Sequence, residues 1–301
     1  MGLSLYVHSM SEMQMQIVIL GASGRLGSYL LPHLISCGHE VLCLSRSKKD
    51  DLCADLTDFG QVCLALRRVT PDVIVNLVAQ TNIDECERCP QNAYLANVKI
   101  VENLAQWIKT SGSLTHLVQL STDQLYDSFG PHKEEEITLK NYYGFSKYAG
   151  EIAASKVNST ILRTNFFGQS RNSDSETFSD WLVDNLIKGK RITVFDDVYF
   201  SPLNLQYLAK ILEIVVLKRR IGTFNLGSRE GMSKADFAFN LAEVLELSTK
   251  NMTRGGVDKA KLVAKRAKDM RMDSSRFEKE YGVELPTLKQ EIQSMKSAYS
   301  Y

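Results

Sequence analysis

The chain has 301 residues, of which 44% are hydrophobic and 24% are charged, and its formal net charge is +1 at pH 7. This length is enough for one large domain or two modest ones with sizeable cores. The nearly neutral charge excludes a global field that would attract nucleic acid or an anionic membrane, and no apolar run is long enough to span a bilayer.

The first residues and the cysteines both favour a cytoplasmic protein. Residues 1–14 lack the basic and apolar segments of a signal peptide, so we expect a loose extension over residues 1–15. Cys86 and Cys89 have CxxC spacing, but no second pair of ligands would complete a zinc site, so we expect ordinary reduced thiols. A redox role is the alternative, although the usual strand–CxxC–helix setting is missing. The six cysteines are Cys37, Cys43, Cys53, Cys63, Cys86 and Cys89.

A glycine-rich turn follows the first predicted strand, Ile17–Leu20. Gly21, Gly24 and Gly27 recur at steps of three, and leucines at helical spacing come next. In such a strand–turn–helix unit the first glycine allows the tight turn and the second lets the backbone approach a pyrophosphate at the helix N-terminus. The third lets the helix pack close to the strand. The stretch therefore predicts a dinucleotide site.

The end of the second predicted strand, Val41–Leu44, indicates which dinucleotide binds. NAD-binding units carry an acidic residue near this position, where it bonds the ribose 2′-hydroxyl. Here Arg46 and two lysines come before the first acid, Asp50, and a guanidinium would attract a 2′-phosphate. We therefore expect NADPH, with NADH as the alternative. The competing interpretation is an ordinary solvated loop.

Strands and helices keep alternating, which predicts an α/β fold: a Rossmann-type, doubly wound parallel sheet with helices on both faces. The further strands expected in this part are Val73–Leu77, His116–Leu120 and Ser159–Arg163. The helices expected are one that Thr57 or Asp58 caps and that runs through Arg67, one over Pro90–Thr110, and one that opens at Tyr143.

The remainder of the chain is less regular. We expect residues 16–168 to form an NAD(P)-binding domain and residues 169–301 to form mainly a smaller C-terminal α/β substrate-binding region, with the late strand Gly222–Leu226 returning to the sheet. The acidic run Glu134–Glu136 is typical of solvated surface. The other elements expected are a strand over Arg191–Phe195 and helices over Phe178–Lys188, Leu205–Leu217, Ser233–Leu247, Arg276–Tyr281 and Thr287–Ser297.

Three side chains suggest the chemistry. Tyr143 and Lys147 are four residues apart and so share one face of a helix, and Thr122 ends a strand on the same side of the sheet. Beside a nicotinamide, this set suits the interconversion of a carbonyl and an alcohol. The ammonium would lower the pKa of the tyrosine, which would act as the acid, and the Thr122 hydroxyl would polarise the carbonyl. The alternative is an exposed Tyr–Lys pair without a catalytic role.

Taken together, these motifs resemble the extended short-chain dehydrogenase/reductase superfamily, and within it the dTDP-4-dehydrorhamnose reductase-like (RmlD-like) family of sugar-nucleotide reductases. The resemblance covers nearly the whole chain after Gln16. The matching stretches are Gly21–Gly27, Pro71–Thr81, Asp84–Glu87, Ser121–Asp127, Tyr142–Glu151 and Ile161–Gly168.

The resemblance implies a role for residues in each part of the site. Thr122, Tyr143 and Lys147 would be catalytic, with Lys147 also holding the nicotinamide ribose. The residues expected to bind the cofactor are Gly21, Ser23, Gly24, Arg25, Leu26, Gly27, Arg46, Asp55, Leu56, Ala79, Gln80, Thr81, Asn97, Tyr143 and Lys147. Those expected to bind the substrate are Thr122, Asp123, Phe166 and Arg266.

Gln124 favours a simple reductase, because sugar-nucleotide 4,6-dehydratases carry a glutamate at this position.

Other positions depart from the family pattern. Phe166 replaces a tryptophan, and the stretch Asp197–Leu203 lacks the usual Gln and Thr. Some relatives bind Mg²⁺ through a glutamate whose place Tyr29 takes here, so we expect no metal.

The resulting hypothesis is an NADPH-dependent reductase of a nucleotide-diphospho-4-keto-6-deoxy sugar, acting in deoxysugar and polysaccharide biosynthesis. Arg266 would hold the substrate diphosphate, or would lie on a solvated basic face. The alternatives are a non-catalytic NADP-binding regulatory subunit that resembles methionine adenosyltransferase β, and a sugar-nucleotide 4-epimerase. The partners expected are the nucleotide-sugar substrate and a second copy in a homodimer, with no nucleic acid and no membrane.

Overall fold

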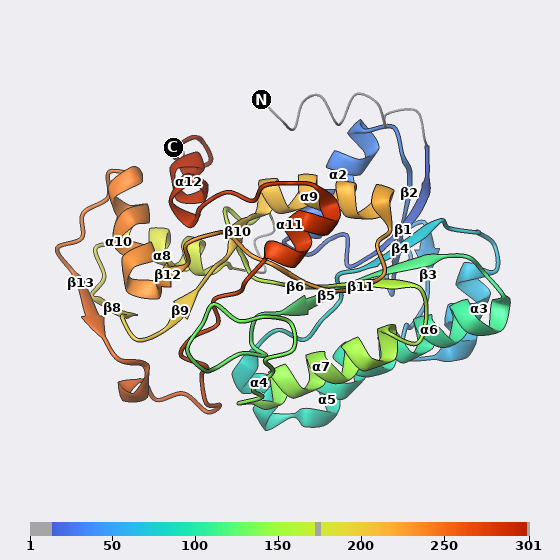
Figure 1. Ribbon diagram of the computed structural model, residues 1–301, viewed down its shortest axis with the longest axis horizontal. Helices are drawn as coiled ribbons and strands as arrows, with labels where there is room; N and C mark the ends of the chain where they lie inside the picture. The colour runs from blue at the N-terminus through green and yellow to red at the C-terminus, as the bar shows by residue number, and fades with distance from the viewer. Residues whose placement is uncertain (1–13, 172–175, 300–301) are drawn as a thin grey trace.

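The structure is a computed structural model and describes residues 14–171 and 176–299, so the extension expected over residues 1–15 lies almost wholly outside it. Its centre is a parallel sheet (Figure 1). In spatial order the seven strands are β11 (Gly222–Leu226), β6 (Ser159–Thr164), β5 (His116–Thr122), β4 (Val73–Asn76), β1 (Gln16–Leu20), β2 (Glu40–Ser45) and β3 (Leu52–Cys53). The predicted return of the late strand is confirmed, because β11 pairs with β6.

The order of the strands reverses beside β1, which pairs with β2 on one side and with β4 on the other. The next strands along the chain then continue outward from β4. In sheets of this kind, ligands bind outside the carboxyl ends of the strands at the point of reversal. The predicted Rossmann-type fold is confirmed, and it places the glycine turn after β1 at that crevice.

Helices cover both faces of the sheet (Figure 1). Side chains along β1 alternate between the two faces: Ile17 and Ile19 belong to one apolar cluster, and Val18 and Leu20 belong to another. The first cluster includes residues of α2 (Gly27–Ser36), α9 (Leu205–Lys218) and α11 (Ser275–Tyr281). The second includes residues of α3 (Phe59–Leu66), α6 (Ile100–Ser111) and α7 (Tyr142–Ala154).

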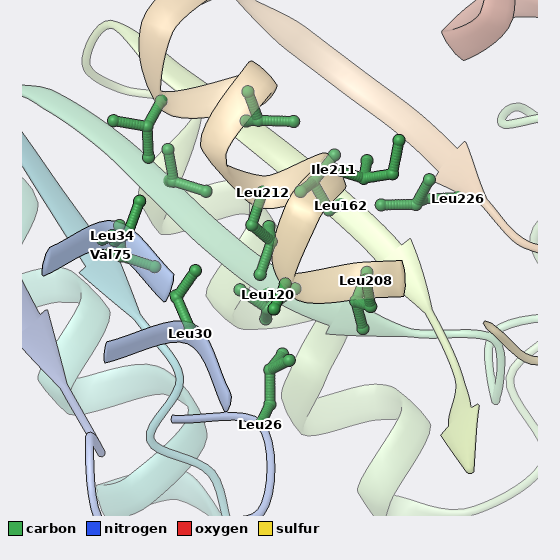
Figure 2. Packing of buried hydrophobic residues seen from close by; sticks show 14 of the residues in the cluster. Leu26, Leu30, Leu34, Val75, Leu120, Leu162, Leu208, Ile211, Leu212 and Leu226 are labelled. Atoms are coloured by element: carbon green, nitrogen blue, oxygen red, sulfur yellow. The ribbon is translucent and has the colours of Figure 1, made fainter. Parts of the chain in front are cut away.

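Figure 2 shows how α2 and α9 meet over the sheet. Leu30 and Leu34 on α2 lie in one cluster with Leu208 and Leu212 on α9, and all four are fully buried. Each buried leucine contributes roughly 1.5–3 kcal/mol relative to an exposed one. The two helices are therefore held together chiefly by apolar packing.

A third apolar cluster lies beside the sheet and gathers mostly later parts of the chain (Figure 1). Phe167, Phe178, Phe200 and Phe237 pack their rings together there. The helices of this part are α8 (Phe178–Ile187), α10 (Lys234–Val244), α12 (Leu288–Gln293) and the short turns η2 (Val257–Lys259) and η3 (Ser294–Ser297). Its strands pair as β7 (Phe166–Phe167) with β10 (Leu203–Asn204), β8 (Ile192–Phe195) with β13 (Met252–Gly255), and β9 (Tyr199–Phe200) with β12 (Met232–Ser233).

The helix expected over Pro90–Thr110 is interrupted. It consists of α5 (Pro90–Tyr94), a π-helical turn η1 (Leu95–Lys99), and α6. A separate short helix, α4 (Ile83–Arg88), comes before it and was not predicted. The cap of α3 agrees with one of the two options, because the Asp58 carboxylate accepts a hydrogen bond from the backbone N–H of Gln61 at 3.1 Å.

The acidic run is only partly solvated, which corrects the expectation for Glu134. Its side chain is 8% exposed and accepts a hydrogen bond of 2.9 Å from the backbone N–H of Asn225 on β11. Glu135 and Glu136 are exposed. The sequence pattern missed this contact because Asn225 lies far along the chain.

Among the described residues, no helix combines the length and the apolar character that crossing a membrane requires.

Candidate active site

The glycine turn holds the N-terminus of α2 tightly against β1. Gly21 has φ +82, in the left-handed region that favours glycine. A Cβ atom on Gly27 would lie 2.3 Å from the Gly21 carbonyl oxygen, so any side chain there would push the helix away. The N–H of Gly24 closes the turn on Gly21 at 3.0 Å, while Ser23 is exposed and Leu26 is buried. The first turn of α2 has no acidic residue, which suits an anionic pyrophosphate.

Arg25 connects the glycine turn with segments that lie far from it in the sequence. Its guanidinium donates to the Thr81 hydroxyl at 3.3 Å and to the backbone carbonyl of Glu176 at 2.9 Å. Its Cζ also lies 5.8 Å from the centre of the Phe166 ring. Three residues expected at the site therefore come together from three distant parts of the chain.

Tyr143 and Thr122 meet at the carboxyl end of β5. Tyr143 lies near the start of α7, where the Asn141 side chain caps the helix by accepting from the Gly144 N–H at 2.9 Å. Burial raises the pKa of the Tyr143 phenol, while a hydrogen bond with Thr122 and the charge of Arg25 act in the opposite direction. The net direction is upward, contrary to the lowering expected from the sequence, because burial dominates. The phenol is therefore protonated at neutral pH, as a proton donor must be.

Lys147 lies one helical turn below Tyr143 and is 4% exposed. Its ammonium donates to the backbone carbonyl of Leu120 at 2.7 Å. Burial lowers the pKa of Lys147 to about 8, and the Glu151 carboxylate opposes this shift. Lys147 is therefore close to its titration point at neutral pH, and Glu151 helps to keep it charged.

Glu151 was missed as a supporting residue, although it lies four residues after Lys147 on the same face of α7. It forms a buried ion pair with Arg163, with hydrogen bonds of 2.7 to 3.2 Å, and it accepts from Ser121 at 2.5 Å. Removing either partner of such a pair costs about 3–5 kcal/mol, because the other charge is left buried without compensation.

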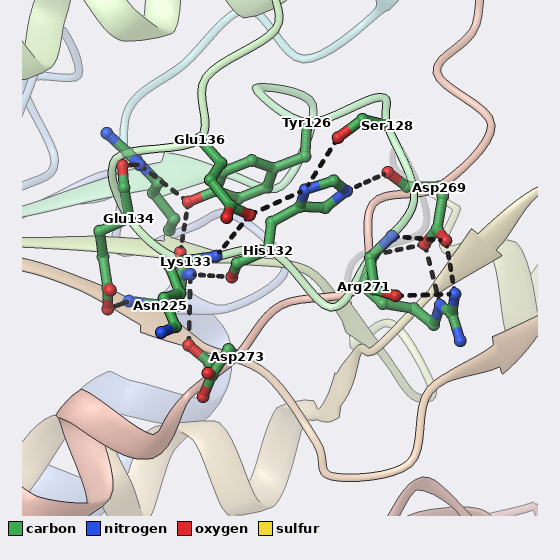
Figure 3. Close-up of polar contacts among 12 residues, drawn as sticks. Tyr126, Ser128, His132, Lys133, Glu134, Glu136, Asn225, Asp269, Arg271 and Asp273 are labelled. Atoms are coloured by element: carbon green, nitrogen blue, oxygen red, sulfur yellow. Dashed lines mark hydrogen bonds and ion pairs between the residues drawn. The ribbon is translucent and has the colours of Figure 1, made fainter.

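The Arg163 guanidinium also donates to the Tyr126 hydroxyl at 2.8 Å, which in turn donates to Asn225 at 2.6 Å. Figure 3 shows this network continuing to His132, whose ring stacks on that of Tyr126 with the centroids 5.0 Å apart. The Asn225 amide donates to the His132 carbonyl at 2.8 Å. The network ties β6, which carries Arg163, and the segment after β5 to the edge strand β11.

Asp123 and Lys234 carry charges that act on each other, which the sequence did not indicate. Burial raises the pKa of Asp123 to about 6, and Asn165, which donates to its carboxylate at 2.7 Å, and the charge of Lys234 oppose that shift. Lys234 begins α10, and its ammonium lies 5.3 Å from the centre of the Phe178 ring and 5.8 Å from that of Phe200. A single lysine at a helix start carries no sequence signal for a site, so only the fold identifies it.

Asn97 supports the loop that follows β4. Its buried amide accepts from the Gln80 N–H at 2.8 Å and donates to the Gln80 carbonyl at 3.1 Å and to Ser146 at 2.9 Å. These bonds use its side-chain hydrogen-bonding groups. Asn97, expected to bind the cofactor, thus holds Gln80 between Ala79 and Thr81, two further residues expected at the cofactor.

The residues expected near the adenosine end lie after β2 and β3. Arg46 is exposed, and its charge lowers the pKa of Asp55, although the hydrogen bonds from Thr57 are the larger cause of that shift. The Asp50 carboxylate accepts from the Ser45 hydroxyl at 2.5 Å, so it is held back against the end of β2. Leu56 is buried beside this loop.

Arg266 is held by an ion pair. Its guanidinium donates to Asp84 at 2.8 Å and to the Ala264 carbonyl at 2.8 Å. Its charge also lowers the pKa of Lys234, for which burial is the larger cause. The sequence analysis did not pair Arg266 with Asp84, whereas the structure joins them and brings the charge of Arg266 near Lys234.

The cysteines are free thiols in the structure. Cys86 is buried against Tyr143, and its thiol donates to the Gln80 carbonyl at 3.5 Å. Burial raises the pKa of Cys86 to about 11, so the thiol is protonated and unreactive at neutral pH.

Comparison with known proteins agrees with this geometry. Residues 15–300 match the family model described as RmlD substrate binding domain. The chain is 26% identical over 299 residues to the probable low-salt glycan biosynthesis reductase of Haloferax volcanii, covering 95% of this chain and 99% of that protein.

Two solved structures share the fold. A hypothetical dTDP-4-dehydrorhamnose reductase from Sulfolobus tokodaii superposes with a TM-score of 0.80 and 32% identity, covering 91% of this chain and 97% of that one. The dTDP-4-dehydrorhamnose reductase from Bacillus anthracis in complex with NADP gives a TM-score of 0.84 at 21% identity, covering 94% of this chain and 99% of that one. Because the family model spans nearly all of the sequence, the resemblance seen in the motifs is confirmed, and the chain belongs to the RmlD substrate binding domain family.

Proposed function

We propose that this protein is an NADPH-dependent reductase of a nucleotide-diphospho-4-keto-6-deoxy sugar. The observation that carries the proposal is the buried Tyr143 phenol in hydrogen bond with Thr122, at the carboxyl end of β5 and close to Arg25 of the glycine turn. The relatives named above as dTDP-4-dehydrorhamnose reductases make dTDP-4-dehydrorhamnose the first substrate to assay.

The residues after β1 fit a dinucleotide. A helix N-terminus without acidic residues, a turn too tight for side chains and the Arg25 cation together suit a pyrophosphate. Gly24, Arg25 and Leu26 would hold the pyrophosphate, Ala79 and Thr81 would line the dinucleotide, and Lys147 would hold the nicotinamide ribose. When bound, NADPH supplies the hydride for the carbonyl carbon.

Side chains of the protein would then orient and protonate the carbonyl oxygen of the substrate. The Thr122 hydroxyl donates a hydrogen bond to the carbonyl oxygen and orients it toward Tyr143. Tyr143 delivers its proton to that oxygen as charge develops, and the Lys147 ammonium stabilises the phenolate that remains. Asp123 and Lys234 face the sugar from two elements, and Phe166 covers it from a third. These roles are part of the proposal.

The test is a panel of nucleotide-4-ketosugars, each incubated with the purified protein and NADPH. We expect NADPH to be consumed with at least one dTDP-linked 4-keto-6-deoxy sugar, and not with the same sugar already reduced at C4. Tight NADPH binding without consumption in the whole panel would contradict the proposal and would favour the non-catalytic regulator.

Homodimer formation remains a prediction. Apolar side chains exposed on the outer face of α7, among them Phe145 and Ile152, each 51% exposed, favour it. Light scattering of the purified protein measures it, and a monomeric mass at assay concentration would exclude it.

A further inference from the structure

Three side chains that bind metals elsewhere in proteins lie together on the face of the sheet that α2 and α9 cover. His33 and Cys37 are one turn apart at the end of α2, and Glu213 faces them from α9. The His33 Nε2 lies 2.8 Å from a Glu213 carboxylate oxygen and 3.8 Å from the Cys37 Sγ. All three ligand atoms lie within 4.8 Å of one another.

His39 follows the cluster in the chain and has a buried side chain without polar partners. Gly38, with φ +88, turns the chain back after α2, and the His39 N–H bonds the carbonyl of Leu34 at 3.2 Å. The His39 side chain is 8% exposed, and neither ring nitrogen has a hydrogen-bond partner among the residues that the structure describes. His39 lies two residues after Cys37, but its ring nitrogens are not among the ligand atoms that all lie within 4.8 Å of one another. Buried polar atoms without partners are rare and call for a ligand or a reason.

We propose that His33, Cys37 and Glu213 form a zinc site that ties α2 to α9. One thiolate and one carboxylate neutralise a divalent cation, the His33 imidazole is the third ligand, and a water completes the tetrahedral set. Sulfur and nitrogen ligands favour Zn²⁺ over Mg²⁺ or Ca²⁺, which prefer oxygen. The proposal replaces the expectation of no metal, which weighed CxxC spacing and the position of Tyr29 but not the His33–Cys37 spacing.

The distances fit with small movements. Zinc bonds of about 2.0–2.3 Å at a tetrahedral angle place neighbouring ligand atoms roughly 3.3–3.8 Å apart. The separation of Cys37 Sγ and His33 Nε2 is already in that range, and the His33–Glu213 contact must widen by roughly half an ångström. The side chains of His33 and Glu213 are 23% and 13% exposed, which leaves an entry path for the ion.

The proton balance is simple. Burial raises the pKa of the Cys37 thiol to about 11, and a hydrogen bond to Glu213 adds to the shift, so the thiol is protonated without the metal. On coordination that proton leaves to solvent, and the metal replaces the hydrogen between His33 Nε2 and Glu213, with the imidazole proton then on Nδ1. No electron is transferred.

The site would be structural. It lies at the far end of α2 from the glycine turn, about 15 Å away at 1.5 Å per residue. The two helices that it joins lie far apart in the sequence, because α2 follows β1 and α9 precedes β11, the first and the last strand of the sheet in chain order. The ion would therefore fix the position of α9 without touching the reacting groups.

The experiment uses the full chain, stripped with a chelator and titrated with Zn²⁺ in a calorimeter. We expect one ion per chain, a higher unfolding temperature with zinc, and at least a tenfold weaker affinity in Cys37→Ser and in Glu213→Gln. Cys53→Ser, which changes an exposed thiol outside the cluster, is the matched control and should bind zinc as the natural sequence does.

Binding of Co²⁺ gives a spectroscopic signal of the thiolate ligand, which a change in unfolding temperature does not give. Co²⁺ bound through the Cys37 thiolate should produce a near-ultraviolet charge-transfer band, present in the natural sequence and in Cys53→Ser and absent in Cys37→Ser. The proposal is overturned if no ion binds tightly, or if Cys37→Ser and Glu213→Gln bind zinc as well as the natural sequence. Because the readouts are binding and spectra, the outcome is independent of whether the protein reduces a sugar.

Discussion

At the scale of single residues, Lys234 is the most informative side chain on the substrate side. Its ammonium lies over the Phe178 and Phe200 rings, and its charge acts on Asp123. We propose that it bonds the substrate, and a charge-assisted bond contributes roughly 1.5–3 kcal/mol. Lys234→Met keeps the stem and removes the charge, so we expect the KM for the ketosugar to rise about ten- to a hundredfold with NADPH affinity unchanged. Lys259→Met, at an exposed position, is the control. An unchanged KM would remove Lys234 from the site.

Arg46 decides the choice of cofactor in this account. If its guanidinium pairs with a 2′-phosphate, Arg46→Ala should weaken NADPH binding about ten- to a hundredfold and leave NADH nearly unchanged. Fluorescence titration with each cofactor measures this. Equal affinity of the natural protein for NADH and NADPH, or equal losses in the mutant, would contradict the role.

Lys147 sets the alkaline limit of activity. Since its pKa is lowered to about 8, its charge is lost as the pH rises through that value, and kcat/KM should fall on the alkaline side. Lys147→Arg keeps a charge at all accessible pH, because the guanidinium titrates far higher. Its residual activity should therefore be flat across that range. If kcat/KM of Lys147→Arg falls over the same alkaline range, the titration belongs to another group.

At the scale of elements, the π-helical turn η1 directs the Asn97 amide toward the loop after β4. Asn97→Ala leaves the N–H and carbonyl of Gln80 without these partners, at a cost of about 1–3 kcal/mol for a buried group. We expect a lower unfolding temperature and weaker NADPH binding, with the KM for the sugar little changed. Gln106→Ala, on the exposed side of α6, is the control. Unchanged NADPH affinity in Asn97→Ala would show that the loop does not depend on this amide.

The elements with a clear apolar pattern were predictable from sequence, whereas those that depend on contacts between distant parts of the chain were not. β1, β5 and α9 are visible as apolar runs or stripes, and the bounds of β11 match the prediction. In the turn η1, Asn97 bonds Gln80 and Ser146, which lie far from it in the sequence. The strand β13 is four residues long, and it is recognisable as a strand only because it pairs with β8. No local pattern encodes either contact.

At the scale of the whole molecule, the site lies where two apolar clusters meet. Thr122, Tyr143 and Lys147 come from the sheet and its helix α7, while Lys234 and Phe200 come from the part built around α8 and α10. The sequence predicted the first group because its motifs are local. It missed the second because the charge of Lys234 comes near Asp123 only when the chain is folded.

The most direct test of the central claim follows the hydride itself. NADPH deuterated on the transferred position of the nicotinamide is incubated with dTDP-4-dehydrorhamnose, and the product is analysed by mass spectrometry and NMR. We predict one deuterium at C4 of the sugar, and a rate about a hundredfold or more lower in Tyr143→Phe, which removes the proton donor and leaves NADPH affinity nearly unchanged. A sugar without deuterium at C4 despite bound NADPH, or wild-type turnover in Tyr143→Phe, would contradict the account.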